Sequence, residues 1–95
     1  MNEKLEQYRK EIDALDIELV DVLARRLAVV RAVGALKAET GLSVVQPERA
    51  KAVVDRAAEM GVEKGLSPDF IRALYHMMID HAHVVEHDII DEERS

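Results

Sequence analysis

Two basic residues in the first half of the chain fall on the same helix face as its apolar residues. At 100° per residue, Arg26 and Lys37 project in the direction of Leu15, Leu19 and Val33. They lie about 16 Å apart along a helix axis. Because a cation on an apolar face needs an anionic partner or hydrogen bonds, the pattern predicts an enclosed pocket for a small anion with more than one carboxylate. The alternative is that both side chains reach solvent or pair with acids at the edge of the core.

Two further arginines could serve the same anion. Arg9 lies at the edge of the apolar face, about 100° from Arg26, where a solvated side chain is the ordinary interpretation. Arg49 falls in the first turn of a second predicted helix, where a cation opposes the helix dipole. That position indicates an ion pair or a carboxylate ligand.

The four histidines are interpreted as structural. His83 and His87 project within about 20° of His76 on the third predicted helix. We predict a polar outer face for these three, although His83 and His87 have the spacing of a metal-binding pair. His81 projects into the apolar side, which predicts an interface position. We expect neither a metal site nor a cofactor.

The composition describes one acidic, folded domain. The 95 residues are 48% hydrophobic and 34% charged, with a net charge of −6 and no cysteine. The lack of cysteine excludes disulfides, thiolate metal sites and a cysteine nucleophile. The acidic balance argues against nucleic acid or anionic membranes as partners, and no apolar run is long enough to span a membrane. We predict a single domain over residues 1–95 and, because the first residues lack the apolar segment of a secretory signal, a cytoplasmic location.

Apolar spacing and helix-start signals predict an all-α fold. Apolar residues recur at spacings of three, four and seven in the first part of the chain, where Gly34 is the only interior breaker. Pro47 fits the first position of a second helix. Ser67-Pro68-Asp69 supplies an N-cap, a proline and an acid for a third. The three helices are expected at about residues 3–39, from Pro47 toward Gly61 and Gly65, and from Ser67 into a frayed end at 91–95.

The first helix is too long for a compact monomer. At 1.5 Å per residue it would extend about 55 Å. A compact protein of 95 residues has a radius of gyration near 12 Å and is about 30 Å across. Half of the apolar face would remain exposed, so we predict an intertwined homodimer in which a partner chain covers the rest.

The order and spacing of these residues resemble the all-helical, AroQ-type chorismate mutases. The stretch Tyr8-Arg9-Lys10-Glu11-Ile12-Asp13-Ala14-Leu15-Asp16 is similar to that family's opening motif, R-x-x-I-(D/S)-x-(L/I)-D. The later matches, which follow at the family's spacings, are Arg25-Arg26, Val33-Gly34, Lys37, Gln46-Pro47-Glu48-Arg49 and Ile71-Arg72-Ala73-Leu74-Tyr75. The resemblance covers essentially the whole chain.

The resemblance implies a three-helix protomer in a homodimer that binds a cyclohexadienyl dicarboxylate with an enolpyruvyl ether. The reaction is a [3,3] rearrangement that breaks a C–O bond and forms a C–C bond in one step, so it needs neither nucleophile nor cofactor. By resemblance, Arg26 and the partner subunit's Arg9 would bind a carboxylate. Lys37 would contact the ether oxygen and a carboxylate, Arg49 would support the site, and Glu86 would face the ether oxygen from the opposite side. The other expected substrate-binding residues are Val33, Gln46, Glu48, Ala50 and Ala82.

Four positions depart from the usual family pattern. The family commonly has an acid at Gln46 and Glu at Ala50, which address the substituent at ring C4, and often Ser at Ala82 and Gln at Glu86. Glu48 is the only obvious acid left near a C4 ammonium.

Two relatives share parts of this altered pattern. Gln-Pro-x-Arg and Val85-Glu86 are similar to 4-amino-4-deoxychorismate mutases. Pro47-Glu48-Arg49, followed by an apolar residue, is similar to isochorismate-pyruvate lyases. We predict a chorismate-mutase-type isomerase acting on chorismate or 4-amino-4-deoxychorismate. The alternatives are an isochorismate-pyruvate lyase and a non-catalytic helical dimerisation module.

Glutamate at position 86 has a consequence for pH dependence. Glutamine would donate a hydrogen bond to the ether oxygen at any ordinary pH, whereas glutamate donates only when protonated. We predict that activity falls as rising pH removes the proton from Glu86. We also expect Arg26 and Lys37, interpreted as unpaired buried cations, to be replaceable by alanine without loss of folding.

Overall fold

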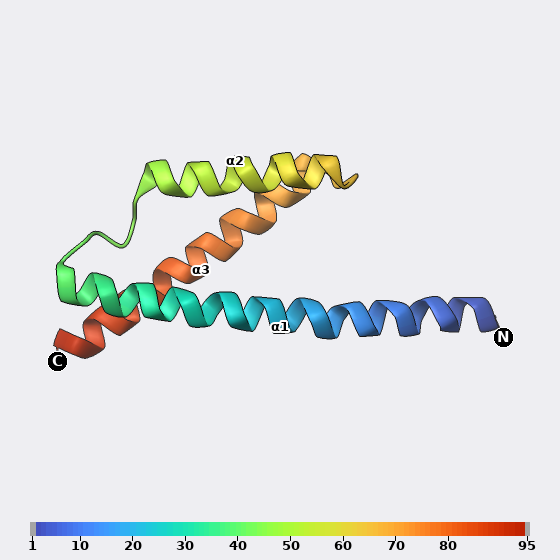
Figure 1. The fold of residues 1–95 in the computed structure, drawn as a ribbon, viewed down its shortest axis with the longest axis horizontal. Helices are drawn as coiled ribbons and strands as arrows, with labels where there is room; N and C mark the ends of the chain where they lie inside the picture. Colours follow the sequence, from blue (N-terminus) through green and yellow to red (C-terminus); the bar gives the residue numbers. More distant parts are fainter. Residues whose placement is uncertain (1, 95) are drawn as a thin grey trace.

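The computed structural model describes residues 2–94, which form three helices (Figure 1). They are α1 (Glu3–Thr40), α2 (Pro47–Glu63) and α3 (Pro68–Arg94), and no strand occurs within residues 2–94. The all-α prediction is confirmed. The frayed end predicted for residues 91–95 is not found over 91–94, because α3 continues to Arg94, and Ser95 lies outside the described residues. Ile90, which is buried, anchors the last turns.

The helix ends follow from local sequence signals. Gly41 adopts a left-handed conformation (φ 73°), and its N–H donates to the Lys37 carbonyl at 2.8 Å, which ends α1. The Ser67 hydroxyl accepts from the Phe70 N–H at 3.3 Å at the start of α3. Pro47 at the first position of α2 and the Ser67 cap of α3 are therefore the predicted start signals of these two helices.

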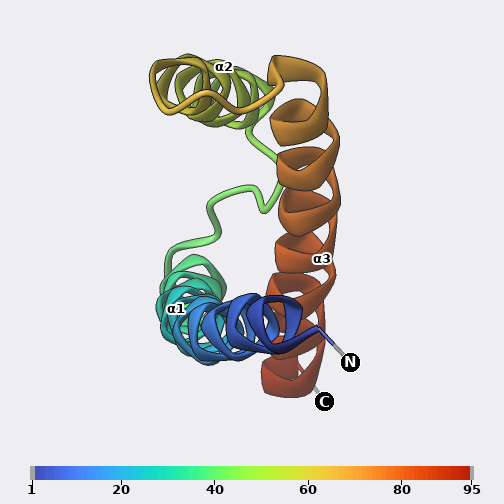
Figure 2. The same ribbon diagram turned by 90° about the vertical axis from the view of Figure 1, so that its right-hand side faces the viewer.

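α1 and α2 both pack on α3 and do not contact each other within the described residues (Figure 2). The α2–α3 contact contains buried Val54 and Ile71. At the same contact, Asp55 accepts hydrogen bonds from Lys51 at 2.7 Å and Arg72 at 2.8 Å. These two cations hold the pKa of the Asp55 carboxyl below its ordinary value. Within the described residues, α1 and α2 are therefore held together by packing only through α3.

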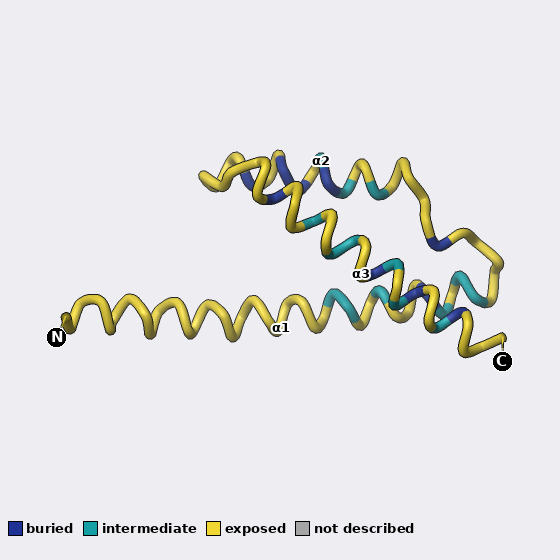
Figure 3. The backbone as a smooth tube through the Cα atoms, turned by 180° about the vertical axis from the view of Figure 1, so that it is seen from behind, coloured by how far each residue is buried: buried dark blue, intermediate teal, exposed yellow. Residues whose placement is uncertain are grey.

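The first half of α1 lies outside this core. All residues from 2 to 25 are exposed (Figure 3), and Ile17 is 74% exposed. The molecule measures 58 × 27 × 14 Å with a radius of gyration of 17.3 Å, against about 12 Å for a compact chain of this length. The overhang predicted from helix length is therefore present. None of the described helices is both long and apolar enough to cross a membrane.

The exposed apolar face of α1 continues into a cavity of about 340 Å³ between α1 and α3. Leu23 and Leu27 of α1 face Met78 and Ala82 of α3 across it. His81 also lines this cavity, on the apolar side predicted for it. Apolar surface of this extent is typical of a site that another protein segment covers.

Candidate active site

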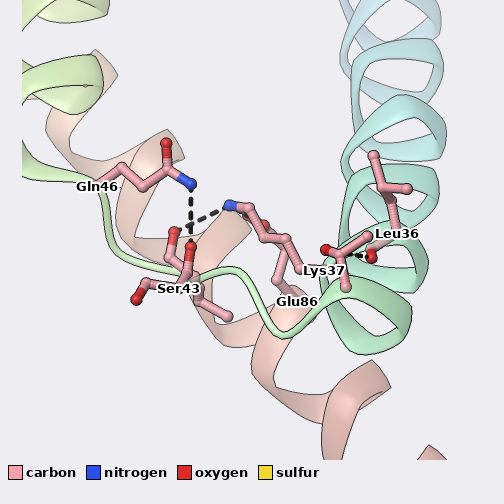
Figure 4. A network of polar contacts seen from close by, with 7 residues as sticks. Leu36, Lys37, Ser43, Gln46 and Glu86 are labelled. Carbon is pink, nitrogen blue, oxygen red and sulfur yellow. Dashed lines mark hydrogen bonds and ion pairs between the residues drawn. The ribbon is translucent and has the colours of Figure 1, made fainter.

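A buried ion pair joins α1 to α3. Lys37 Nζ donates to Glu86 Oε1 at 2.7 Å and to the Val44 carbonyl at 3.0 Å (Figure 4). The two charged side chains are only 12% and 6% exposed. The expectation that Lys37 is an unpaired cation is therefore wrong, because a carboxylate from α3 neutralises it. Removing either side chain would leave the other charge buried without a partner, which is strongly destabilising.

Gly34 permits the close approach that makes this pair. It is the buried residue of α1, one turn before Lys37. A Cβ at Gly34 would lie 3.2 Å from the Glu86 Cα and 3.3 Å from Ile89 Cδ1. A glycine inside a helix costs about 1 kcal/mol relative to alanine. The absence of a Cβ at Gly34 lets the α3 backbone lie against α1, with Glu86 within reach of Lys37.

The Gly34→Ala variant should lose activity more than stability. The new methyl group meets the α3 backbone and separates α1 from α3 by a few tenths of an ångström, which displaces Glu86 from Lys37. We expect kcat/KM to fall about tenfold or more, while the gain of about 1 kcal/mol in helix propensity offsets part of the lost packing. Steady-state kinetics and thermal melting measure the two effects.

Gly61→Ala is the matched control for this prediction. Its Cβ would lie 2.9 Å from Ile71 Cγ1, at the α2–α3 contact away from the ion pair. This variant should lose stability without a comparable loss of activity per folded molecule. Full activity in Gly34→Ala would show that the interface yields and that Gly34 does not position Glu86.

A cavity of about 180 Å³ opens beside the ion pair, between α1, α2 and α3. It gathers residues that are far apart in the sequence. The predicted site residues that line it are Arg26, Val33, Lys37, Gln46, Arg49, Ala50, Ala82 and Glu86. Three basic side chains and one carboxylate therefore surround a space of small-molecule size.

Two predicted site residues lie elsewhere in the protomer. Arg9 is exposed on the overhanging part of α1 and pairs with Glu6 at 2.7 Å. Glu48 is exposed at the start of α2 and borders a separate surface depression next to Arg49. The structure does not bring Glu48 into the cavity, so the interpretation of Glu48 as the acid for a C4 ammonium finds no support there.

Lys37 keeps one hydrogen-bond donor for a ligand. Its ammonium has three N–H groups, of which one bonds Glu86 and one bonds Val44. Glu86 likewise engages only Oε1. No buried side-chain oxygen or nitrogen within residues 2–94 lacks a hydrogen bond, so the unbonded Oε2 of Glu86 must be open to solvent. An N–H and a carboxyl oxygen are thus available next to each other at one end of the cavity.

Arg26 reaches from α1 toward α3. It is half-buried, and its guanidinium carbon lies 5.9 Å from the centre of the Tyr75 ring, a cation–π distance. Neither Arg26 nor Arg49 has an acidic partner within residues 2–94. Both guanidinium groups are therefore free to bind the carboxylates of a ligand in a bidentate manner.

Comparison with known proteins assigns this arrangement to a family. A sequence profile of chorismate mutase type II matches residues 8–87. The chain belongs to the type II chorismate mutase family. It is 33% identical to a 4-amino-4-deoxychorismate mutase of Streptomyces venezuelae, over 95% of this chain and 87% of that protein. It is 25% identical to a chorismate mutase of Methanocaldococcus jannaschii over 100% of this chain and 96% of that protein, and 32% identical to an isochorismate pyruvate lyase of Pseudomonas aeruginosa over 86% and 79%.

One residue of this mutase-family cavity was misinterpreted from sequence. His83 is half-buried and lines the cavity with Arg49 and Glu86, so its predicted place on the outer face is wrong. His76 and His87 are exposed as predicted. The signal for His83 was its position three residues before Glu86, because residues three apart share a helix face. The Val44 carbonyl, which fixes Lys37, carried no signal because it is a backbone group.

Gln46 presents an acceptor where many family members have an acid. Its Nε2 donates to the Ser43 carbonyl at 3.2 Å, which directs the amide oxygen away from that loop (Figure 4). The adjacent Ala50 contributes only a methyl group. Gln46 and Ala50 therefore contribute no carboxylate to the lining of the cavity.

Proposed function

We propose that the protein is a mutase that converts 4-amino-4-deoxychorismate into its prephenate-type product by a [3,3] rearrangement. The observation that carries the proposal is the Lys37–Glu86 pair beside Arg26 and Arg49 in one cavity. Chorismate is the second candidate substrate, favoured by the likeness to a chorismate mutase over the full chain.

The cavity residues can supply what this reaction needs. Arg26 and Arg49 hold the two carboxylates, which fixes the folded conformer in which the new C–C bond forms. As the C–O bond breaks, negative charge grows on the ether oxygen. The free N–H of Lys37 and a protonated Glu86 Oε2 donate to that oxygen and stabilise the transition state.

The C4 end of the cavity suits an amino group. An amino or ammonium nitrogen donates hydrogen bonds. The Gln46 Nε2 is already bonded to the Ser43 carbonyl, which leaves the amide oxygen of Gln46 to accept one. The methyl group of Ala50 leaves room beside it. Gln46, rather than the exposed Glu48, is therefore our candidate for recognising the C4 substituent.

A product assay with three substrates tests this assignment. We expect the highest kcat/KM with 4-amino-4-deoxychorismate, then chorismate. Release of pyruvate from isochorismate as the fastest reaction would instead indicate a lyase. No turnover, together with no calorimetric binding of a bicyclic oxa-bridged diacid that mimics the transition state, would indicate a non-catalytic module.

We further propose that the active unit is a homodimer in the cytoplasm. The exposed apolar face of α1 supports this, because it needs a cover of matching length. The partner subunit's Arg9 would then approach the cavity and share a carboxylate with Arg26.

Light scattering at micromolar concentration should give twice the mass of 10.7 kDa. Deleting residues 1–10 should abolish activity because it removes Arg9, whereas Lys10→Ala, the control, should retain it. A folded, helical monomer in the wild-type protein would contradict the dimer.

A further inference from the structure

Three arginines converge on a second cavity that adjoins the first. Arg26, Arg49 and Arg56 line this space of about 210 Å³ together with Met60 and Tyr75. None of the three has an acidic partner within residues 2–94. Like charges gathered at one site repel each other. An anion from outside the protomer would therefore reduce the repulsion within this arginine cluster.

The overhanging part of α1 is rich in acids. Residues 2–21 contain seven acidic and three basic side chains, all of them exposed. Asp16 lies seven residues after Arg9 and projects to the same flank of the apolar face, whereas Glu11 and Glu18 project to the opposite flank. Asp16 forms no ion pair within the described residues. It is an unpaired acid on a surface that needs a cover.

The direction of the helices indicates that Asp16 of one subunit can approach the arginine cluster of the other. This step rests on the proposed dimer. In an antiparallel two-fold pair, the overhang of each α1 lies over the α2 and α3 of the other subunit, whereas a parallel pair would leave both of those surfaces bare. α2 runs opposite to its own α1 (Figure 1). The partner's α1 would therefore run in the same direction as α2.

The spacing of the charges along the two helices is the same. Arg49 and Arg56 are seven residues apart on α2, as Arg9 and Asp16 are on α1, which is about 10.5 Å in each helix. If the partner subunit's Arg9 lies at the substrate cavity beside Arg49, the partner subunit's Asp16 lies beside Arg56.

We propose that Asp16 of the partner subunit enters the arginine cluster and pairs with Arg56, once at each end of the dimer. This pair neutralises Arg56, leaves Arg26 and Arg49 for the substrate carboxylates, and fixes the register of the two α1 helices. The register in turn places Arg9 at the substrate cavity. Asp16 and Arg56 are positioning residues, since neither touches the reacting atoms.

Charge reversal tests the pair. Asp16→Arg and Arg56→Asp should each raise the dimer dissociation constant about a hundredfold or more, because like charges then face each other. The double variant Asp16→Arg/Arg56→Asp restores opposite charges and should return to within about tenfold of wild type. Glu18→Arg is the matched control for Asp16→Arg, since Glu18 is exposed and projects to the opposite flank of α1; it should leave the constant nearly unchanged. Sedimentation equilibrium measures it.

A cross-linking experiment covers the case in which a reversed variant fails to fold. The chain has no cysteine, so Asp16→Cys/Arg56→Cys creates the only thiols. A short bismaleimide should join two such chains, and should not join chains of Glu18→Cys/Arg56→Cys.

Two outcomes would overturn the pair while leaving the proposed activity intact. One is a wild-type dissociation constant in Arg56→Asp. The other is the absence of a cross-link in Asp16→Cys/Arg56→Cys. A rise in substrate KM without any change in dimerisation would mean that Arg56 binds a small anion instead. Failure of the proposed function appears separately, as lack of turnover by the wild-type dimer.

Discussion

Lys37→Ala is expected to lower kcat/KM by more than a hundredfold, or roughly 3 kcal/mol in the barrier. The ammonium group is held by Glu86 at 2.7 Å and by the Val44 carbonyl at 3.0 Å. It is therefore already oriented before substrate binds, and in the proposed reaction its third N–H would stabilise the charge that develops on the ether oxygen. Single-turnover and steady-state kinetics with 4-amino-4-deoxychorismate and chorismate measure the loss.

The same substitution should also destabilise the fold. It leaves the carboxylate of Glu86, 5% exposed, without its cation. Breaking a buried pair in this way costs about 3–5 kcal/mol. The double variant Lys37→Ala/Glu86→Gln removes the buried charge and should regain most of the stability, but not the activity. Recovery of activity in the double variant would show that Lys37 serves only the fold.

Arg26→Ala separates the two effects. Arg26 has no acidic partner in the described protomer, so its loss should leave the protein folded. It should nevertheless lower kcat/KM by more than about a hundredfold. Lys51→Ala, which removes an exposed lysine, is the charge-matched control. A variant that melts early but keeps its activity when folded would contradict a role in substrate binding.

Because of Glu86, we expect the plot of kcat against pH to fall on its alkaline side. In the proposed reaction the neutral acid would donate a hydrogen bond to the ether oxygen, whereas the ionised carboxylate is an acceptor only and would repel the negative charge that develops there. We therefore expect kcat to fall as rising pH removes the proton.

Two variants test the role of Glu86. Glu86→Gln donates at all pH values, so it should flatten the limb and retain much of the activity. Glu86→Ala should lose the donor throughout, at about 2–4 kcal/mol in the barrier. The measurement is kcat against pH for the three proteins. An alkaline limb that persists in Glu86→Gln would mean that Glu86 acts as a carboxylate that holds Lys37 in place.

The three helices and the overhang of α1 follow from local signals in the sequence. Apolar spacing, Pro47 and the Ser67 cap are local signals, and a helix forms from local hydrogen bonds between residues four apart. Because α1 is longer than a compact domain of this size is wide, its first half must extend beyond the core. The placement of Arg26 and Lys37 on the apolar face was also visible, because the helix period alone sets it.

The contacts of the buried charges depend on how the helices pack against one another. The pairing of Lys37 with Glu86 spans 49 positions and depends on how closely α1 and α3 approach, which Gly34 allows. From sequence, Lys37 was interpreted as an unpaired cation and His83 as a surface residue, and the close approach that Gly34 allows was not visible. These three points were missed for one reason. The helix period gives the direction of a side chain from its own axis, but contact is set by the distance and crossing of two helices, and these depend on packing between residues far apart in the chain.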